Sequence, residues 1–356
     1  MATSVPANST GHKPHRLLLI SVPRTASNLL LKILNIHHQP NVLTNDKGGY
    51  FFFDAYVSGV QDGRFLTPLE QWSEEARTQL RDLYQGSLDK LEEWSARARA
   101  DNKTMFSKEH SFLFLNPAIL FAPPGGEDAA SSGPMSQFFR LRIPESYGPQ
   151  QTWSPNNRTV LSDEYLRTWQ MAFLIRHPAL AFPSLYRAMM KMTKEGIMTE
   201  DGARGANPRS TLTLKWTRML FDWCCEQTQQ LSNGQKEAAM PLLLDAHDII
   251  HNPSVVLRFC EAAGLDKNAV QFEWNAEEKK IDWNNDFGAK SQAIMLSTLQ
   301  NSTGIVKDKA PAVIDVKAEA EKWKEEFGPE VGGMIEQAVL DAMPDYEYLR
   351  EKRVRA

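Results

Sequence analysis

The sequence predicts an α/β fold with three layers, in which a central parallel sheet lies between helices on both faces. Short apolar runs such as "LLLI", "QMAFLI" and "PLLLD" alternate with longer stretches of helical spacing. That alternation is typical of βαβ units, whose strands are parallel. Polar and charged residues follow several of these runs directly, as expected where strands end at the ligand-binding edge of such a sheet.

Length and composition are those of a globular chain. The 356 residues are 42% hydrophobic and 24% charged, and the net charge is −4. This balance argues against non-specific binding of nucleic acid. No apolar stretch reaches the roughly 18 residues that a membrane span needs. We expect residues 1–15 to be a disordered tail and residues 16–356 to form one domain.

Two sequence features indicate the cellular compartment: the start of the chain and the cysteines. The first residues contain no apolar signal region. Three cysteines form neither a disulfide framework nor a pattern of metal ligands. We therefore expect a cytoplasmic protein that holds no metal and has neither nucleic acid nor a membrane as a partner.

The N-terminal half begins with a predicted strand over residues 15–22 and a helix over about 27–35. Residues 73–101 carry leucines and tyrosine at helical spacing. The stretch "TMFSKEH", residues 104–110, reads as a second strand that ends in polar residues. Residues 122–158 are rich in proline, glycine, serine and asparagine, so we expect a long inserted loop there.

The C-terminal half repeats the alternation. A short helix in "EYLRTW" precedes a strand in "QMAFLIRHP", which proline ends, and a helix follows in "ALAFPSLYRAMMKMTKEG". Residues 211–232 predict a further helix. "PLLLDAHD" predicts a buried strand that leads into a helix over 253–263, which Gly264 ends. Residues 315–352 are mostly helical and highly charged.

The first candidate site is the polar turn "PRTASN", residues 23–28, between the first strand and the first helix. The start of a helix offers unpaired N–H groups and a positive dipole end, which bind phosphate or sulfate. Thr25, Ser27 and Asn28 add side-chain donors, and Arg24 adds a permanent charge. Because the turn lacks the glycines of a Walker A loop, it should hold one tetrahedral anion. An ordinary capped turn is the alternative.

Two further candidates lie at other predicted strand ends. Arg176 ends a strand and Ser184 follows within the next helix, so both could reach one anion; a salt-bridged arginine and a surface serine are the alternative. Lys108 and His110 share one face of their strand because the side-chain period is two. Histidine is the side chain best suited to take a proton near neutral pH, although a structural histidine also fits.

Together these motifs resemble those of the sulfotransferases that use 3′-phosphoadenosine 5′-phosphosulfate (PAPS). "PRTASN" is similar to the family's P-K-S-G-T-T motif, with Arg24 at the lysine position and Ala26 at the glycine position. Arg176 and Ser184 match the family's pair for the 3′-phosphate, and Lys108-Glu109-His110 is similar to its K-x-H. The likeness spans about residues 16–265. It implies a P-loop-like fold and a microbial or fungal small-molecule enzyme.

The resemblance implies transfer of a sulfuryl group from PAPS to a hydroxyl or amine of a small aromatic or apolar acceptor. His110 would be the general base, Arg24 would stabilise the transferring group, and Lys108 would add positive charge. Lys307, in "NSTGIVKDK", is a candidate for the family's C-terminal basic group. The residues implied in donor binding are therefore Arg24, Thr25, Ala26, Ser27, Asn28, Arg176, Ser184 and Lys307.

Two other functions remain open. A P-loop phosphotransferase or NTPase could use Asp245 of "PLLLD" as a Walker B carboxylate, although the sequence lacks Gly-Lys-Ser/Thr. A non-catalytic nucleotide-binding protein would fit the replacement of lysine by Arg24.

We expect the acceptor pocket among the aromatic residues of 49–56, 112–121 and 138–139. The loop over residues 122–158 would close over it as a lid.

Overall fold

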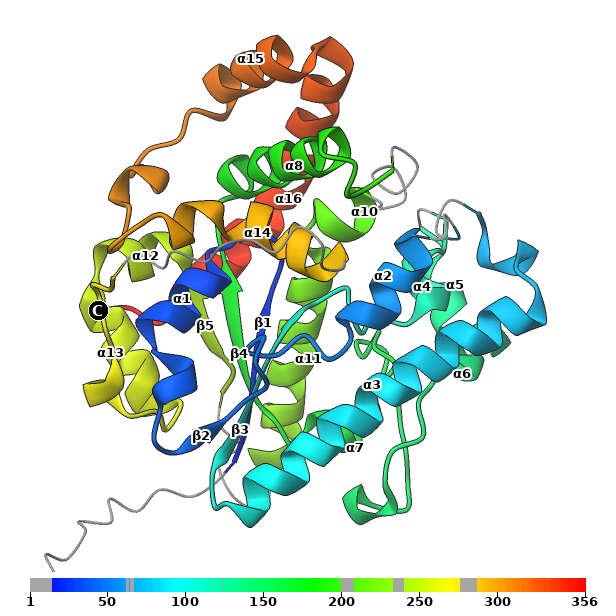
Figure 1. Ribbon diagram of the computed structural model, residues 1–356. Coiled ribbons are helices and arrows are strands. Elements are labelled where there is room, and N and C mark those ends of the chain that lie inside the picture. Colours follow the sequence, from blue (N-terminus) through cyan, green and yellow to red (C-terminus); the bar gives the residue numbers. More distant parts are fainter. Residues whose placement is uncertain are drawn as a thin grey trace, which may run out of the picture.

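The structure is a computed structural model, and it describes residues 15–61, 64, 67–123, 125–199, 208–232, 240–275 and 287–356 (Figure 1). The predicted tail, residues 1–15, lies outside these ranges apart from His15. The glycine-containing stretch "GIMTEDGARGANPRS", residues 196–210, predicts a loop, and its residues 200–207 also lie outside these ranges.

Five strands form the central sheet: β1 (Arg16–Ser21), β2 (Val42–Leu43), β3 (Thr104–His110), β4 (Gln170–Ile175) and β5 (Leu242–Asp245). They pair in the order β2-β3-β1-β4-β5, and each neighbouring pair is parallel. The parallel sheet is therefore confirmed. Because β3, β1 and β4 are adjacent, the residues that follow their carboxyl ends meet at one edge of the sheet.

Side-chain alternation along β1 divides the core into two layers. Leu17 and Leu19 pack against α1 (Ser27–Ile33), α12 (Ala246–His251) and α13 (Pro253–Ala262). Leu18 and Ile20 pack on the opposite face, in a cluster that includes residues of α3 (Glu74–Ala100) and α11 (Lys215–Ser232). Helices thus cover both faces of the sheet (Figure 1), which is the predicted three-layer, P-loop-like arrangement.

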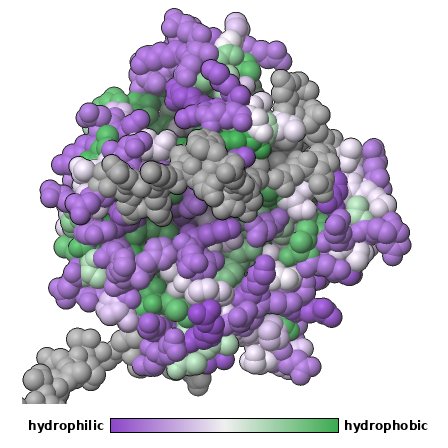
Figure 2. All heavy atoms as spheres, viewed as in Figure 1, coloured by the Kyte–Doolittle hydropathy of each residue, from purple (hydrophilic) through white to green (hydrophobic). Residues whose placement is uncertain are grey.

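A third apolar cluster lies among α8 (Pro178–Lys194), α15 (Val316–Phe327) and α16 (Pro329–Glu351). Figure 1 shows α14 (Phe287–Gln300) next to α8, which it contacts. Hydrophilic residues dominate the face of the molecule seen in Figure 2, and apolar residues show between them. Among the described helices, none has the length and apolar character needed to cross a bilayer.

The boundaries show where sequence patterns were insufficient. The strand predicted over residues 241–248 ends at Asp245, because the Asp245 carboxylate accepts the His247 N–H and begins α12. Strand β2, helix α14 and helix α2 (Phe53–Gln61) were not predicted. The apolar run "FFF" begins α2, and such a run alone does not distinguish a helix from a strand.

The prediction of one long loop over residues 122–158 is wrong. The segment contains α5 (Glu127–Ser132), α6 (Pro134–Phe138) and a 3₁₀ turn, η4 (Glu145–Tyr147), and it follows α4 (Pro117–Leu120). Phe139 is fully buried in the core. A short helix, α7 (Asp163–Leu166), then leads into β4.

The lid prediction for the same segment is also wrong. The Tyr147 hydroxyl donates to Glu92 and accepts from Arg16, which begins β1. Residue 147 therefore lies at the amino edge of the sheet, opposite the edge where the candidate residues meet. Apolar burial and these hydrogen bonds hold the segment in place.

Candidate functional site

The carboxyl edge of the sheet brings the predicted residues together. Ser21, the last residue of β1, pairs with His110, the last residue of β3. Arg176 directly follows β4, and the 22–26 turn joins β1 to α1. Motifs that are far apart in the sequence therefore surround one region, as the strand-end argument predicted.

The turn after β1 has an unusual backbone. Arg24 and Ala26 have φ angles of 67° and 66°, in the left-handed region that favours glycine. The Thr25 hydroxyl donates to the Val22 carbonyl at 2.8 Å, and Thr25 is fully buried. The expectation that this hydroxyl would face an anion is therefore wrong, because it closes the turn instead.

A cavity of about 430 Å³, here called the arginine cavity, lies beside this turn. Arg24 donates from Nε to the Ser184 hydroxyl at 3.0 Å and from Nη1 to the Met295 carbonyl at 2.6 Å. Arg176 donates from Nη1 to the Arg24 carbonyl at 2.9 Å. The cavity lining thus unites Arg24, Arg176 and Ser184, two of the candidates that were placed at separate strand ends. Its other charged lining residues are Arg187, Lys309, Asp308, Asp315 and Glu319.

The two arginines favour an anionic ligand in this cavity. Burial, and then the nearby Arg24, lower the pKa of Arg176 to about 10, whereas Asp245 raises it. Burial lowers the pKa of Arg24 as well. The Arg176 Nε is buried and has no hydrogen-bond partner among the described residues. An anion would compensate both cations and could satisfy this donor.

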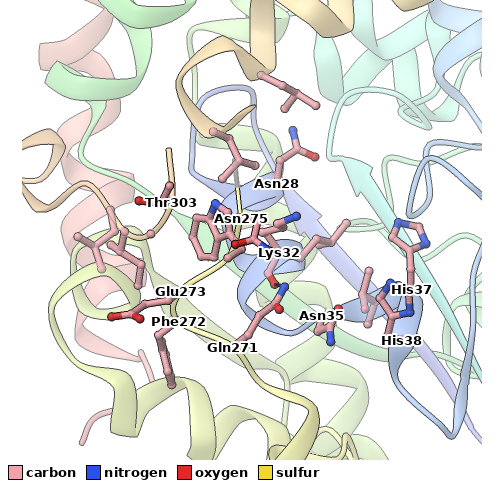
Figure 3. Close-up of a pocket in the computed structure, with 18 of the residues that line it drawn as sticks. Asn28, Lys32, Asn35, His37, His38, Gln271, Phe272, Glu273, Asn275 and Thr303 are labelled. Carbon is pink, nitrogen blue, oxygen red and sulfur yellow. Dashed lines mark hydrogen bonds between the residues drawn. The ribbon is translucent and has the colours of Figure 1, made fainter. Parts of the chain in front are cut away.

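Lys307 lines a different, larger cavity of about 1360 Å³, here called the outer cavity. Figure 3 shows Asn28 and Lys32 of α1 on one wall of it and residues 271–275 on another. Lys309, which the sequence analysis did not single out, lines the arginine cavity, and its carbonyl accepts from Arg176 at 2.6 Å. The role suggested for Lys307 in 3′-phosphate binding stays a prediction.

Lys108 does not face an open cleft, contrary to the expectation from strand alternation. It is fully buried, its ammonium donates to the Asn28 side-chain oxygen Oδ1, and it lies 4.4 Å from the centre of the Tyr50 ring. Burial lowers its pKa to about 7, although Glu109 raises it. Lys108 therefore ties α1 to the 45–52 turn.

His110 lies in a chain of hydrogen bonds. Its Nδ1 is 3.0 Å from the Ser21 hydroxyl, and its Nε2 is 3.0 Å from the Tyr50 hydroxyl. Burial, and then Lys108, lower the pKa of the imidazole to about 3, whereas a hydrogen bond to the Ser21 main chain raises it. The ring is therefore neutral near pH 7, and it is a weaker base than a free imidazole.

His110 lines a third cavity of about 340 Å³, here called the apolar cavity. Its aromatic residues are Tyr50, Phe53, Tyr56 and Phe112, and its methionines are Met189, Met192, Met198 and Met295. The predicted aromatic stretches 49–56 and 112–121 thus contribute, but Phe138 and Phe139 do not. Phe138 lies instead below the Arg81 guanidinium of α3, 4.7 Å from it.

The arginine cavity and the apolar cavity meet. Arg24, Ser27 and Asn28 line both, together with Met295 and Leu296 of α14. Their shared wall is thus the turn after β1 and one face of α14. A group held beside the arginines therefore lies next to the cavity that contains His110.

Sequence reasoning missed Ser21 and Met295, and it placed Tyr50 only within the aromatic stretch 49–56, without a contact to His110. No local pattern identifies Ser21, the last residue of an apolar strand. Tyr50 follows two glycines in "KGGYFFF", and that glycine pair is the signal of a constrained turn that could have drawn attention to it. Met295 lies on α14, which was itself not predicted.

No family model matches the chain. Two curated relatives match nearly its whole length. The sulfotransferase ppzF of Metarhizium rileyi is 38% identical over 355 residues, which cover 97% of each chain. The sulfotransferase ppzF of Metarhizium majus is 38% identical over 354 residues, which cover 97% of this chain and 98% of that relative.

Solved structures give weaker similarity. A sulfotransferase domain from the curacin biosynthetic pathway has 15% identity and a TM-score of 0.37, and the match covers 88% of this chain and 97% of that domain. A sulfotransferase domain from the Synechococcus PCC 7002 olefin synthase has 14% identity and a TM-score of 0.36, with coverage of 90% and 97%.

Proposed function

Because this chain belongs to the sulfotransferase family, we propose that it transfers a sulfuryl group from PAPS to a hydroxyl or amine of a small, apolar or aromatic acceptor. One observation carries the proposal. A cavity with two arginines that form no ion pair among the described residues shares a wall with an apolar cavity lined by a neutral histidine. The first suits an anionic donor and the second suits an apolar nucleophile.

The arginine cavity fits PAPS by its chemistry. PAPS supplies the sulfuryl group, and its 3′-phosphate adds a second anionic centre. Arg176 and Ser184 would bind the 3′-phosphate, and the unpartnered Arg176 Nε supports this assignment. Ser27, Asn28 and the main chain of residues 24–28 would bind the other anionic end.

His110 would accept the acceptor's proton. Its neutral state near pH 7 and its place in the wall of the apolar cavity support that role. Arg24 lies where both cavities meet, so its guanidinium would stabilise charge on the transferring group. Lys108 would act through the Asn28 side chain, behind the first turn of α1, and would add positive charge when it is protonated.

The donor assignment is tested by calorimetry with adenosine 3′,5′-bisphosphate against ATP, with and without EDTA. We expect tight binding of the bisphosphate that EDTA does not change. Tight, Mg²⁺-dependent binding and turnover of ATP would favour a phosphotransferase instead. Binding of the bisphosphate without transfer to any hydroxyl or amine in a broad panel would favour a non-catalytic nucleotide-binding protein.

A matched pair of variants locates the 3′-phosphate. Arg176→Ala should remove the preference for the 3′-phosphorylated nucleotide over its analogue that lacks this phosphate. Arg187→Ala is the control, because Arg187 also lines the cavity but its guanidinium is held by Glu326 through two hydrogen bonds of 2.6 Å. That variant should keep the preference. Equal loss of affinity for both nucleotides in Arg176→Ala would contradict the assignment.

A further inference from the structure

The turn before α2 holds the Tyr50 phenol against His110, the candidate base. Tyr50 has a φ angle of 62°, a strained value for an aromatic residue. Gly49 precedes it with a φ of 130°, and a Cβ on Gly49 would lie 2.2 Å from the Lys108 main-chain nitrogen. Only glycine therefore permits the turn to approach β3 this closely.

Several hydrogen bonds fix this turn to β3. The Tyr50 N–H donates to the Lys108 carbonyl at 2.7 Å. The Glu109 carboxylate accepts the N–H groups of Phe51 and Phe52 at 2.6 and 3.3 Å. Lys108 and Glu109, which hold the turn through these hydrogen bonds, thus lie on the same strand as His110. Backbone strain that is held in place by its surroundings is concentrated at functional sites.

Both ring nitrogens of His110 have a hydroxyl partner. Nδ1 lies 3.0 Å from the Ser21 hydroxyl, and Nε2 lies 3.0 Å from the Tyr50 hydroxyl. A neutral imidazole has one donor and one acceptor nitrogen. With the proton on Nδ1, the ring donates to Ser21 and Nε2 accepts from the Tyr50 hydroxyl, and this is the tautomer that a relay through Tyr50 requires.

Tyr50 lines the apolar cavity, and its hydroxyl forms a hydrogen bond with a residue at the wall that the two cavities share. That residue is Ser27, whose hydrogen bond lowers the pKa of the phenol, against a larger increase from burial. Ser27 lines both cavities. A phenol oxygen that donates one hydrogen bond can still accept others.

We propose that Tyr50 is a catalytic proton relay between the acceptor and His110, so that the acceptor hydroxyl docks on the phenol rather than on the imidazole. This inference rests on the proposed function. As the acceptor oxygen bonds to sulfur, its proton passes to the Tyr50 oxygen, and the Tyr50 proton passes to His110 Nε2. The electron pair of the breaking sulfur–oxygen bond stays on the donor's phosphate oxygen.

The kinetic test compares Tyr50→Phe with wild type on two phenols of similar shape. Phenylalanine keeps the ring that contacts Lys108 but removes the relay. Turnover of 4-methylphenol, whose pKa is about 10 as in tyrosine, should fall by about 10²-fold or more. Turnover of 4-nitrophenol at mildly alkaline pH should fall less than about threefold, because that acceptor has already lost its proton.

Tyr56→Phe is the matched control. Tyr56 lines the same cavity, but its hydroxyl lies 3.2 Å from Ser210. Whatever its effect on turnover, that effect should be the same for both phenols. An equal loss for both phenols in Tyr50→Phe, or no loss in either, would overturn the relay. If the wild-type chain transfers from PAPS to no phenol, alcohol or amine, the proposed function itself fails.

A measurement without substrate tests the same inference. In ¹⁵N-histidine spectra of the free wild-type protein near pH 7, His110 should carry its proton on Nδ1, and the Nε2 signal should shift in Tyr50→Phe. The signal is assigned with His110→Gln. A proton on Nε2 would overturn the relay whichever acceptor the enzyme uses. Calorimetry with adenosine 3′,5′-bisphosphate establishes that Tyr50→Phe is folded.

Discussion

Three residues of the site adopt left-handed backbone conformations without being glycine: Arg24, Ala26 and Tyr50. Each such residue costs about 1–2 kcal/mol relative to an ordinary conformation. Two of them shape the turn after β1, where the Thr25 hydroxyl closes onto Val22. The third places a phenol on His110. Local strain is thus gathered where the two cavities meet.

At Ala26 we predict that the protein tolerates glycine, the residue of the family motif at this position. Ala26→Gly should leave stability unchanged or raise the free energy of unfolding by up to about 1 kcal/mol, because glycine adopts this φ without strain. Ala26→Val should lower it by about 2 kcal/mol, because a β-branched residue is poorly accommodated at positive φ. Urea unfolding measures both. Equal stabilities for the two variants would contradict the role of backbone strain.

At His110 we predict a loss of chemistry without a loss of binding. His110→Ala should reduce turnover by about 10²–10⁴-fold, the usual contribution of a general base. Calorimetry with adenosine 3′,5′-bisphosphate should give an affinity close to that of wild type, since His110 does not line the arginine cavity. If the variant kept more than about a tenth of the activity, His110 would not be the base.

At the scale of elements, strand β3 connects several parts of the site. Each of its last three residues contacts a different part. Lys108 bonds to Asn28 of α1, Glu109 binds the main chain before α2, and His110 faces the apolar cavity. Both charged residues are buried, and burial raises the pKa of Glu109 to about 8. Burial therefore favours the protonated form of this carboxyl in the folded protein.

This raised pKa predicts a pH dependence of stability. Between the ordinary pKa of glutamate, about 4.5, and the folded value, the folded state binds more protons than the unfolded state, so the contribution of Glu109 falls as pH rises. Glu109→Gln keeps an acceptor for both N–H groups and cannot ionise. Near pH 8 this variant should be about 2–4 kcal/mol more stable than wild type, and near pH 4.5 the two should be similar. A pH-independent difference would contradict the assignment.

At the scale of the whole molecule, Arg16 joins the sheet to segments distant in sequence. Its guanidinium bonds to Glu92 of α3, to the Tyr147 hydroxyl and to the Tyr165 hydroxyl, at 2.6–3.0 Å. It also lies 4.0 Å from the centre of the Trp169 ring. This cluster lies at the amino edge of the sheet. The contacts of Arg16 and the candidate site therefore lie at opposite edges.

The separation of the two edges is testable. Arg16→Ala should lower the free energy of unfolding by about 3 kcal/mol, because it leaves the partly buried Glu92 carboxylate without its cation. Denaturant unfolding measures this loss. Under conditions where the variant is folded, its affinity for adenosine 3′,5′-bisphosphate should equal that of wild type. A large loss of affinity would show that the two edges are coupled.

The sequence by itself determined the α/β class, most strands and helices, and the placement of Arg24, Arg176, Ser184 and His110 at one edge of the sheet. Those features follow from side-chain periodicity and from strand ends, which are local properties of the chain. The chemistry expected of these residues follows from the family resemblance and stays a proposal.

Only the tertiary structure decided which side chains meet. The Thr25 hydroxyl bonds within its own turn, Lys108 is buried against Asn28, and Tyr147 bonds to Glu92 and Arg16 at the amino edge of the sheet. Tyr50 contacts His110 from 60 positions away, and Tyr147 contacts Arg16 from 131 positions away. No local pattern encodes such contacts, because they depend on how separate elements pack against one another.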